Sequence, residues 1–149
     1  MRILHVYKDF PPVLGGIENH LRDLAVGQAA AGHEVTVLVT ARGPRSKVSL
    51  EGGVRVVRAG RLATVASTPI SLGLVRELRR LRPDVTHLHI PYPWGEAAWL
   101  MAGRHPMVAT YHSDVVRQRA LGILWAPALH RLLARADRVL ATSPRYAAT

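Results

Sequence analysis

Two adjacent glycines, Gly15 and Gly16, stand where a short apolar segment gives way to a helical pattern. Because glycine has no Cβ atom, a ligand can approach the backbone closely at this point. The first N–H groups of a helix have no partner within the helix, and the helix dipole is positive at that end. A helix that begins here is therefore suited to bind a phosphate or another anion, although an ordinary strand-to-helix turn can use the same residues.

Histidines form a second group of candidates. His112 ends an apolar segment, and His87 and His89 lie two apart in another, so they share a face if that segment is a strand. Two such histidines form half of a metal site, but no neighbouring Cys, Asp or Glu cluster completes one, and we expect no bound metal. We expect His89 to line a cleft and His87 to pack inside, while His5 and His20 have no evident partner.

Alternating strands and helices must position these residues. Short β-branched or apolar segments predict strands, and apolar residues three or four apart predict helices. The expected strands are 3–7, 34–40, 54–59, 85–90, 107–112 and 138–142, and the expected helices are 17–31, 71–82, 94–103 and 121–136. The polar segment 42–53 predicts a loop, the pattern over 61–70 is ambiguous, and Pro127 is expected to bend or split the last helix.

This alternation predicts an α/β fold, a Rossmann-like parallel sheet with helices on both faces. In such sheets ligands bind beyond the carboxyl ends of the strands. The residues that follow the strands are therefore the candidates for ligand contact. Besides His112, they are Tyr7, Asp9, His89, Tyr92, Ser113 and Asp114.

Composition narrows the class of partner. The 149 residues suffice for one domain, and the absence of cysteine excludes disulfides and thiolate chemistry. A formal charge of +10 favours anionic partners, whereas 5% aromatic residues argue against a protein that stacks single-stranded nucleic acid, so no nucleic acid partner is expected. With no long apolar run and no signal-peptide pattern, we expect a cytoplasmic chain.

Arg76, Arg79 and Arg80 form the densest cluster of charge, on one side of the helix expected over 71–82. A basic amphipathic helix can dock on anionic lipid, which would place the protein at the inner face of the plasma membrane. A solvated helix face has the same composition, and the sequence leaves both interpretations open.

An ordered set of motifs resembles the family 4 glycosyltransferases and covers essentially the whole chain. The matching motifs are Pro11-Pro12-x-x-Gly15-Gly16-Ile17-Glu18, Gly32-His33-Glu34-Val35, Asp84-Val85-x-His87-x-His89-x-Pro91, Thr110-Tyr111-His112-Ser113-Asp114 and Arg135-Ala136-Asp137-x-Val139. The segment 111–118 is most similar to bacterial enzymes that build surface polysaccharides, many of them mannosyltransferases.

The resemblance implies a GT-B enzyme, in which two Rossmann-like domains enclose the active site. Residues 1–149 would be the N-terminal, acceptor-side domain, with the donor-binding domain absent and the isolated chain inactive. Ser143-Pro144 resembles the start of a helix that Thr149 leaves barely one turn long, so we expect a piece of a longer protein.

Family membership would also assign roles to residues. Gly15 and Gly16 would lie near the donor diphosphate, and His112 would orient or polarise the reacting groups near the transferred sugar. The reaction would retain configuration without a metal, using GDP-mannose or a UDP-sugar and a glycan or lipid-linked acceptor. By its position alone, two residues after His112 at the end of a predicted strand, Asp114 is either a general base or a residue that forms a cap or pairs with Arg117.

A Rossmann-like module that binds NADP or a polyanion is the alternative. Arg42 and Arg45 follow the second strand, where a ribose phosphate would lie. The glycine fingerprint GxGxxG of dinucleotide-binding domains is absent after the first strand, which weakens this alternative.

Overall fold

The computed structural model describes residues 1–103, 106–112 and 119–143, the side chains of 119–124 excepted. The strands of its main sheet are β1 (Arg2–Val6), β2 (Glu34–Thr40), β3 (Lys47–Glu51), β4 (Val54–Ala59), β7 (Val85–Ile90), β8 (Met107–Tyr111) and β9 (Arg138–Ala141). They lie in the order β3-β4-β2-β1-β7-β8-β9, and every neighbouring pair is parallel except β3 with β4. A separate antiparallel pair, β5 (Ala63–Val65) and β6 (Thr68–Ile70), occupies the segment whose pattern is ambiguous.

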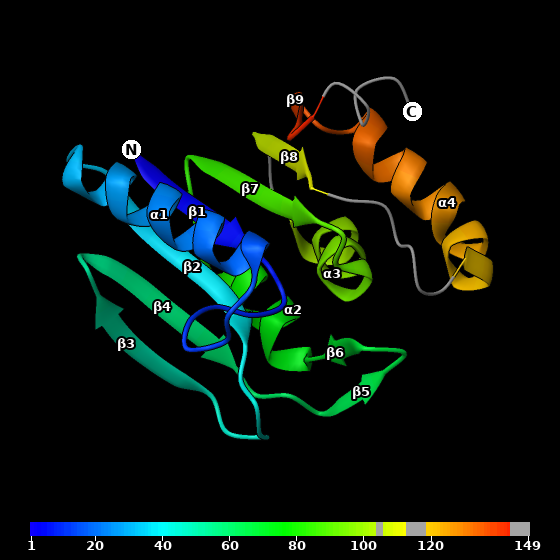
Figure 1. Ribbon diagram of the computed structural model, residues 1–149, viewed down its shortest axis with the longest axis horizontal. Helices are drawn as coiled ribbons and strands as arrows, with labels where there is room; N and C mark the ends of the chain where they lie inside the picture. The colour runs from blue at the N-terminus through cyan, green and yellow to red at the C-terminus, as the bar shows by residue number, and fades with distance from the viewer. Residues whose placement is uncertain (104–105, 113–118, 144–149) are drawn as a thin grey trace.

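The helices cover both faces of this sheet. They are α1 (Gly16–Ala30), α2 (Leu72–Arg80), α3 (Pro93–Ala102) and α4 (Arg119–Ala134). Figure 1 shows α1 in front of the sheet and α2 and α3 behind it. The predicted α/β class with helices on both faces is therefore confirmed. Of the two effects expected of Pro127, the split does not occur, because α4 is one continuous helix through this residue, and the bend stays a prediction.

The core lies between these layers. Every residue of β1 and β2 after the first is buried, because each of these central strands is covered on both faces. Such strands are rich in apolar and β-branched residues along their whole length, which is why the sequence pattern identifies them.

The prediction of a loop over 42–53 is wrong where β3 lies, because this strand forms an edge hairpin with β4. Gly52 and Gly53 make the turn with positive φ angles of 56° and 79°, a conformation that glycine adopts without strain. The side chains of β3 are exposed or half-buried on both faces. The strand alternates polar and apolar residues, with Val48 and Leu50 between polar neighbours, but this signal is only five residues long and lies in a polar segment rich in Gly and Pro. Arg58 on β4 joins the hairpin by donating to Ser49 and Glu51.

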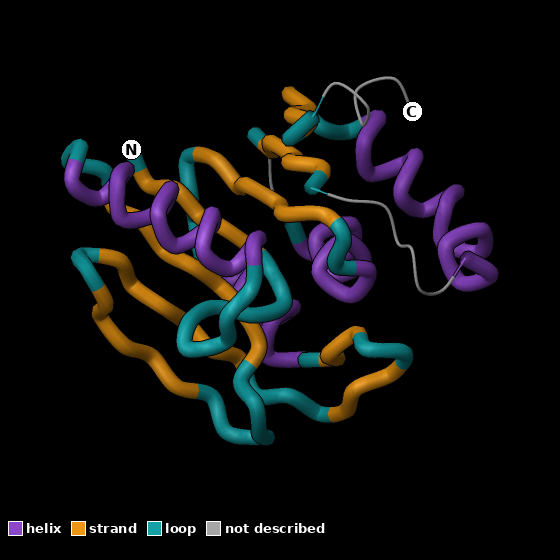
Figure 2. Tube along the Cα trace, in the orientation of Figure 1, coloured by secondary structure: helices purple, strands orange, loops and turns teal. Residues whose placement is uncertain are grey.

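The order of the parallel strands identifies the edge where a ligand would bind. Apart from β3, the sequence of strands across the sheet is that of a Rossmann fold, with β1 and β7 at the point where the chain reverses its direction across the sheet. The connections that follow β1 and β7 lie at the same edge (Figure 2). The carboxyl ends of these two strands are therefore the place to look for a site.

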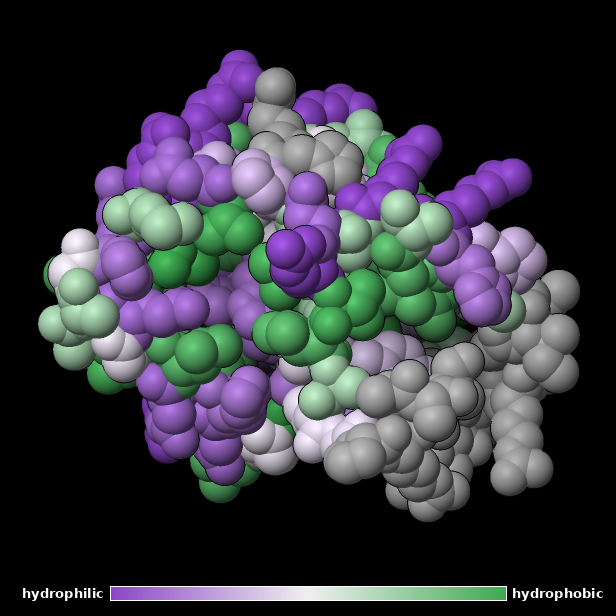
Figure 3. Space-filling view, turned by 90° about the horizontal axis from the view of Figure 1, so that it is seen from above, coloured by the Kyte–Doolittle hydropathy of each residue, from purple (hydrophilic) through white to green (hydrophobic). Residues whose placement is uncertain are grey.

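Not all apolar surface is covered in the described part of the chain. Val139 and Leu140 on β9 are 49% and 50% exposed. Figure 3 shows a central band of apolar side chains between hydrophilic margins on the upper face of the molecule. Among the described residues, no helix has both the length and the apolar content that a membrane span requires.

Candidate functional site

At the start of α1, the space beside Gly16 is open, whereas the space beside Gly15 is filled by another side chain. Gly15 is the N-cap, in extended conformation and without a side chain that could cap the helix. A Cβ atom on Gly15 would collide with the carboxylate of Glu18, whereas one on Gly16 would meet nothing within 4 Å. Anion binding at these N–H groups stays a prediction, and Gly16 is the position with room for it.

Four histidines gather beneath α1. His5 on β1 pairs in register with His87 on β7, so their side chains lie side by side on one face. His89 follows two residues later on the same face, with its ring stacked on that of His87 at 4.4 Å between centroids. His112 comes directly after β8, and its ring stacks on that of His89 at 5.3 Å. Strand pairing thus gives His5 the partner that sequence reasoning did not find.

Hydrogen bonds join three of these rings to α1. His5 Nε2 lies 2.7 Å from Gln28 Oε1, and His5 Nδ1 lies 3.1 Å from His89 Nε2. His89 Nδ1 in turn lies 3.0 Å from His112 Nε2. These contacts therefore run from the last turn of α1, along one face of the sheet, to the carboxyl edge.

His112 also lies beside the beginning of α1. The ring of His20 packs edge-on against it, with 5.2 Å between centroids. His20 is one helical turn after Gly16. The open helix start and His112 therefore lie near the same edge of the sheet, and their roles in a common site stay a prediction.

Burial keeps these histidines neutral. It lowers the pKa of His5 to about 4 and that of His87 to about 3, and it places the pKa of His89 well below its usual range. The pKa of the half-buried His112 is lowered to about 4, chiefly by burial and then by His20. At neutral pH these rings can accept and donate hydrogen bonds, but they do not act as cations.

The same histidines are candidates for a metal site. One ring nitrogen from each of His5, His87 and His89 lies within 4.8 Å of the others, and three imidazoles are a known zinc ligand set. However, His5 and His89 share a hydrogen bond, and His87 Nε2 lies 2.6 Å from Thr110 Oγ1. These contacts, with those of Gln28 and His112, occupy both ring nitrogens of His5 and His89 and Nε2 of His87 without an ion, and the expectation of no metal stays a prediction.

Three of the residues expected to contact an acceptor lie below the surface. Tyr7 and Tyr92 are each 2% exposed and His89 is 1% exposed. Tyr92 donates its hydroxyl to Pro69 O at 2.9 Å, and its ring meets that of Tyr7 edge-on. Burial raises the pKa of both tyrosines. Their contact with an acceptor stays a prediction, and in the structure they form the wall beneath the edge.

Asp9 is held by an arginine that sequence reasoning missed. Arg61 Nη2 lies 3.3 Å from Asp9 Oδ1, and Arg61 also donates to Ala41 O at 2.9 Å and to Thr40 Oγ1 at 3.3 Å. These contacts tie the loop after β1 to the end of β2. Arg61 belongs to the ambiguous segment 61–70, and its only signal in the sequence was its positive charge.

Two further predicted site residues, Ser113 and Asp114, lie outside the described residues, and so does the continuation of the helix expected at Ser143-Pro144.

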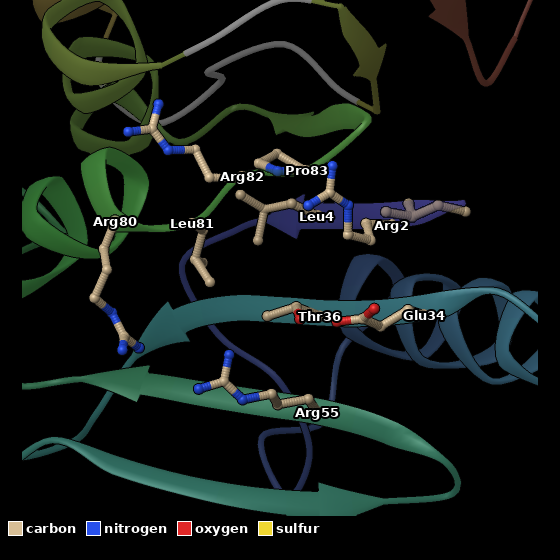
Figure 4. Close-up of a pocket in the computed structure, with 10 residues that line it drawn as sticks. Arg2, Leu4, Glu34, Thr36, Arg55, Arg80, Leu81, Arg82 and Pro83 are labelled. Atoms are coloured by element: carbon tan, nitrogen blue, oxygen red, sulfur yellow. The ribbon is translucent and has the colours of Figure 1, made fainter.

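A basic pocket of about 210 Å³ lies at the opposite, amino edge of the sheet. Its arginines come from β1, β4, the end of α2 and the connection to β7 (Figure 4). They are Arg2, Arg55, Arg80 and Arg82. Arg2 and Arg80 are paired with Asp84 and Glu77. Arg76, Arg79 and Arg80 are all exposed on α2, as the sequence predicts.

Comparison with known proteins identifies relatives over the whole chain. The family profile of Glycosyltransferase Family 4 matches residues 14–149. D-rhamnosyltransferase WbpZ of Pseudomonas aeruginosa is 37% identical over 153 residues, which cover 100% of this chain and 40% of the relative. O-antigen chain mannosyltransferase C of Escherichia coli is 34% identical, with 100% of this chain and 41% of the relative covered. GDP-mannose-dependent alpha-mannosyltransferase of Mycolicibacterium smegmatis is also 34% identical, with 96% and 42% covered.

A solved structure supports the fold. Sucrose-phosphate synthase from Thermosynechococcus elongatus superposes with a TM-score of 0.71 at 19% identity, covering 99% of this chain and 43% of that protein. The chain thus spans about 40% of the length of the curated relatives named above.

Proposed function

This chain belongs to Glycosyltransferase Family 4, and we propose that it forms the N-terminal, acceptor-side domain of a retaining glycosyltransferase. The proposed reaction transfers a sugar from GDP-mannose or a UDP-sugar to a glycan or a lipid-linked acceptor. The names of the rhamnosyl- and mannosyltransferases among its relatives support a hexose donor.

One observation carries this proposal. The open start of α1 and the ring of His112 both lie at the edge where β1 and β7 end, and His20, one turn into α1, contacts the ring of His112. This is the edge at which Rossmann-like sheets bind their ligands. The opposite, amino edge offers no comparable combination of a helix start and neutral imidazoles among the described residues.

Each part of the edge has a task in the proposed reaction. The N–H groups at Gly16 and the positive end of α1 would stabilise the negative charge that develops on the departing diphosphate. His112 would hold a hydroxyl of the transferred sugar in position. Asp9, fixed by Arg61, would bind a hydroxyl of the acceptor, with Tyr7, His89 and Tyr92 supporting these groups from below. Ser113 and Asp114 remain proposed acceptor contacts.

The donor pocket itself would lie in a second domain. The relatives are more than twice as long as this chain, which is consistent with an additional domain that holds the nucleotide sugar. We therefore expect the 149-residue chain alone to turn over little or no substrate. The comparisons give no support to the NADP-binding or polyanion-binding alternative.

We further propose that the protein works in the cytoplasm at the inner face of the membrane, where lipid-linked acceptors are available. Arg76, Arg79 and Arg80 are exposed along α2, and the pocket at the amino edge adds Arg55 and Arg82. Clustered arginines of this kind attract anionic lipid headgroups.

The experiment that tests the proposed function is a transferase assay on the complete protein. Nucleotide release would be measured with a panel of GDP- and UDP-sugars, with and without an extract of lipid-linked acceptors. Release that depends on one donor and on the acceptor is expected. A folded protein that releases no nucleotide with any pair, yet gains a large thermal stabilisation from NADPH and none from GDP or UDP, would contradict the proposal.

A further inference from the structure

The hydrogen bonds between the histidines have a direction, and Gln28 sets it. A carbonyl oxygen only accepts, so at the contact of 2.7 Å with Gln28 Oε1 the Nε2 atom of His5 must carry the proton. A neutral imidazole carries one proton, so His5 Nδ1 is then an acceptor. His89 Nε2, at 3.1 Å, must donate to it.

The same reasoning continues to the edge of the sheet. Because His89 donates through Nε2, its Nδ1 accepts, and the donor at 3.0 Å is His112 Nε2. His112 is then left with an unprotonated Nδ1. Among the described residues this nitrogen has no hydrogen-bond partner, and the ring is only half-buried.

We propose that Gln28 fixes the tautomer of His112 through His5 and His89, so that His112 presents a hydrogen-bond acceptor, Nδ1, to the carboxyl edge. In this arrangement Gln28, His5 and His89 are positioning residues. The proposal rests on the proposed function only in assigning the acceptor nitrogen to a sugar or acceptor hydroxyl.

The surroundings of the hydrogen-bonded histidines favour neutral imidazole rings. His5 and His89 are 0% and 1% exposed, and His87 and His20 bring further imidazoles rather than carboxylates. No acidic group is bonded to these rings in the described part of the chain, so a proton taken up by His112 would have no counter-charge. The hydrogen-bonded histidines therefore orient a hydroxyl group through His112 and do not take up the proton of that hydroxyl.

The test reads the tautomer directly. Imidazole nitrogens of the uniformly 15N-labelled 149-residue chain would be observed by long-range proton–nitrogen correlation at pH 7.5, with His112 assigned by comparison with His112→Ala. Protonated and unprotonated ring nitrogens have clearly separated shifts. We expect His112 to show a protonated Nε2 and an unprotonated Nδ1, and the exposed His130 to serve as the internal reference.

Two variants test the role of Gln28. Gln28→Met keeps the length of the side chain but removes the acceptor. If the hydrogen bonds kept their direction, the buried N–H of His5 would have no partner. We therefore expect the opposite direction of the hydrogen bonds to be favoured about tenfold. His112 should change to a protonated Nδ1. Gln28→Glu restores an acceptor and should restore the original pattern. In the complete enzyme, kcat should fall about tenfold in Gln28→Met and recover in Gln28→Glu.

The outcomes separate this inference from the proposed function. An Nδ1-protonated or cationic His112 in the unchanged chain would overturn it, as would an unchanged tautomer in a folded Gln28→Met or a stoichiometric metal ion held by His5, His87 and His89. If Gln28→Met does not fold, the protonation pattern of His112 in the unchanged chain and in Gln28→Glu decides whether the inference holds. Tautomers as expected in a complete protein without transferase activity would refute the proposed function alone.

Discussion

At the residue scale, burial determines which chemistry the histidines can perform. The usual pKa of 6.5 falls to about 4 for His5 and to about 3 for His87, because both rings are shielded from water between α1 and the sheet. A neutral ring at the end of β8 can orient a hydroxyl without repelling other cations. A solvated histidine, with its usual pKa of 6.5, would be partly cationic near neutral pH and would not present one fixed hydrogen-bonding pattern to that hydroxyl.

These lowered pKa values predict that the protein is sensitive to acid. In the unfolded chain His5 and His112 bind protons as the pH falls through about 6.5, whereas in the folded chain these two rings do so only at about pH 4. The stability that they contribute is therefore present above pH 6.5 and is lost as the pH falls toward 4. For His5 alone the loss approaches about 3 kcal/mol. Urea denaturation at pH 7.5, 6.0 and 5.0 measures it.

The control for this prediction is the exposed His130. His130→Gln should leave the decrease unchanged, whereas His5→Gln should reduce it. Equal stability at pH 7.5 and pH 5.0 would show that the buried rings do not titrate as inferred.

Sequence reasoning located the candidate site residues better than it located the side chains that contact them. His112, Gly16 and Asp9 were placed at the carboxyl edge because each follows a predicted strand or begins a predicted helix. The contacts of His5 with His89 and of Asp9 with Arg61 depend on which strands are neighbours and in which register. That information is not contained in any short segment, so these partners could not be predicted.

At the scale of elements, Glu96 stabilises the connection that carries the chain from β7 into α3. It is 3% exposed, and it accepts hydrogen bonds from the backbone N–H of Tyr92 and from Trp125 Nε1 on α4. Burial raises the pKa of this carboxyl. One side chain thereby joins a strand end, a helix start and a second helix.

Removing this side chain should destabilise the fold. Glu96→Ala leaves the buried N–H of Tyr92 and the part-buried Nε1–H of Trp125 without an acceptor, which we expect to lower the free energy of unfolding by about 2–4 kcal/mol. Glu96→Gln should cost less, because it retains an acceptor. Asp23→Ala, which breaks only an exposed ion pair, serves as the control and should change stability by less than about 1 kcal/mol. Equal effects of Glu96→Ala and Asp23→Ala would refute the assigned role.

The central elements of the sheet were predicted, and so was the exposed edge strand β9, but β3 and the pair β5 and β6 were not. The parallel strands from β1 to β8 and the helices between them have patterns set by the core. β5 and β6 have only three residues each, and β3 and β5 are mostly exposed, so local composition does not distinguish these strands from loops.

At the scale of the whole molecule, charge and chemistry lie at opposite edges of the sheet. The arginine pocket lies at the amino edge, and His112 lies at the carboxyl edge. Changing Arg76, Arg79 and Arg80 to glutamate should abolish sedimentation of the protein with anionic vesicles at low salt, since phosphate headgroups are attracted by the local cations.

A matched variant separates local from overall charge. Arg131, Arg135 and Arg138 are also exposed, and changing them to glutamate alters the net charge by the same amount. This control should retain most of the vesicle binding. If both triple variants lose binding equally, the net charge of +10 rather than α2 is responsible.

The central claim is that the carboxyl edge of this chain is the reaction site, and the kcat of His112→Ala in the complete protein tests it most directly. We expect kcat to fall about a hundredfold, with the KM for the nucleotide sugar changed by less than about threefold. The exposed His130→Ala is the control and should leave both constants unchanged. An unchanged kcat in a folded His112→Ala would contradict the account.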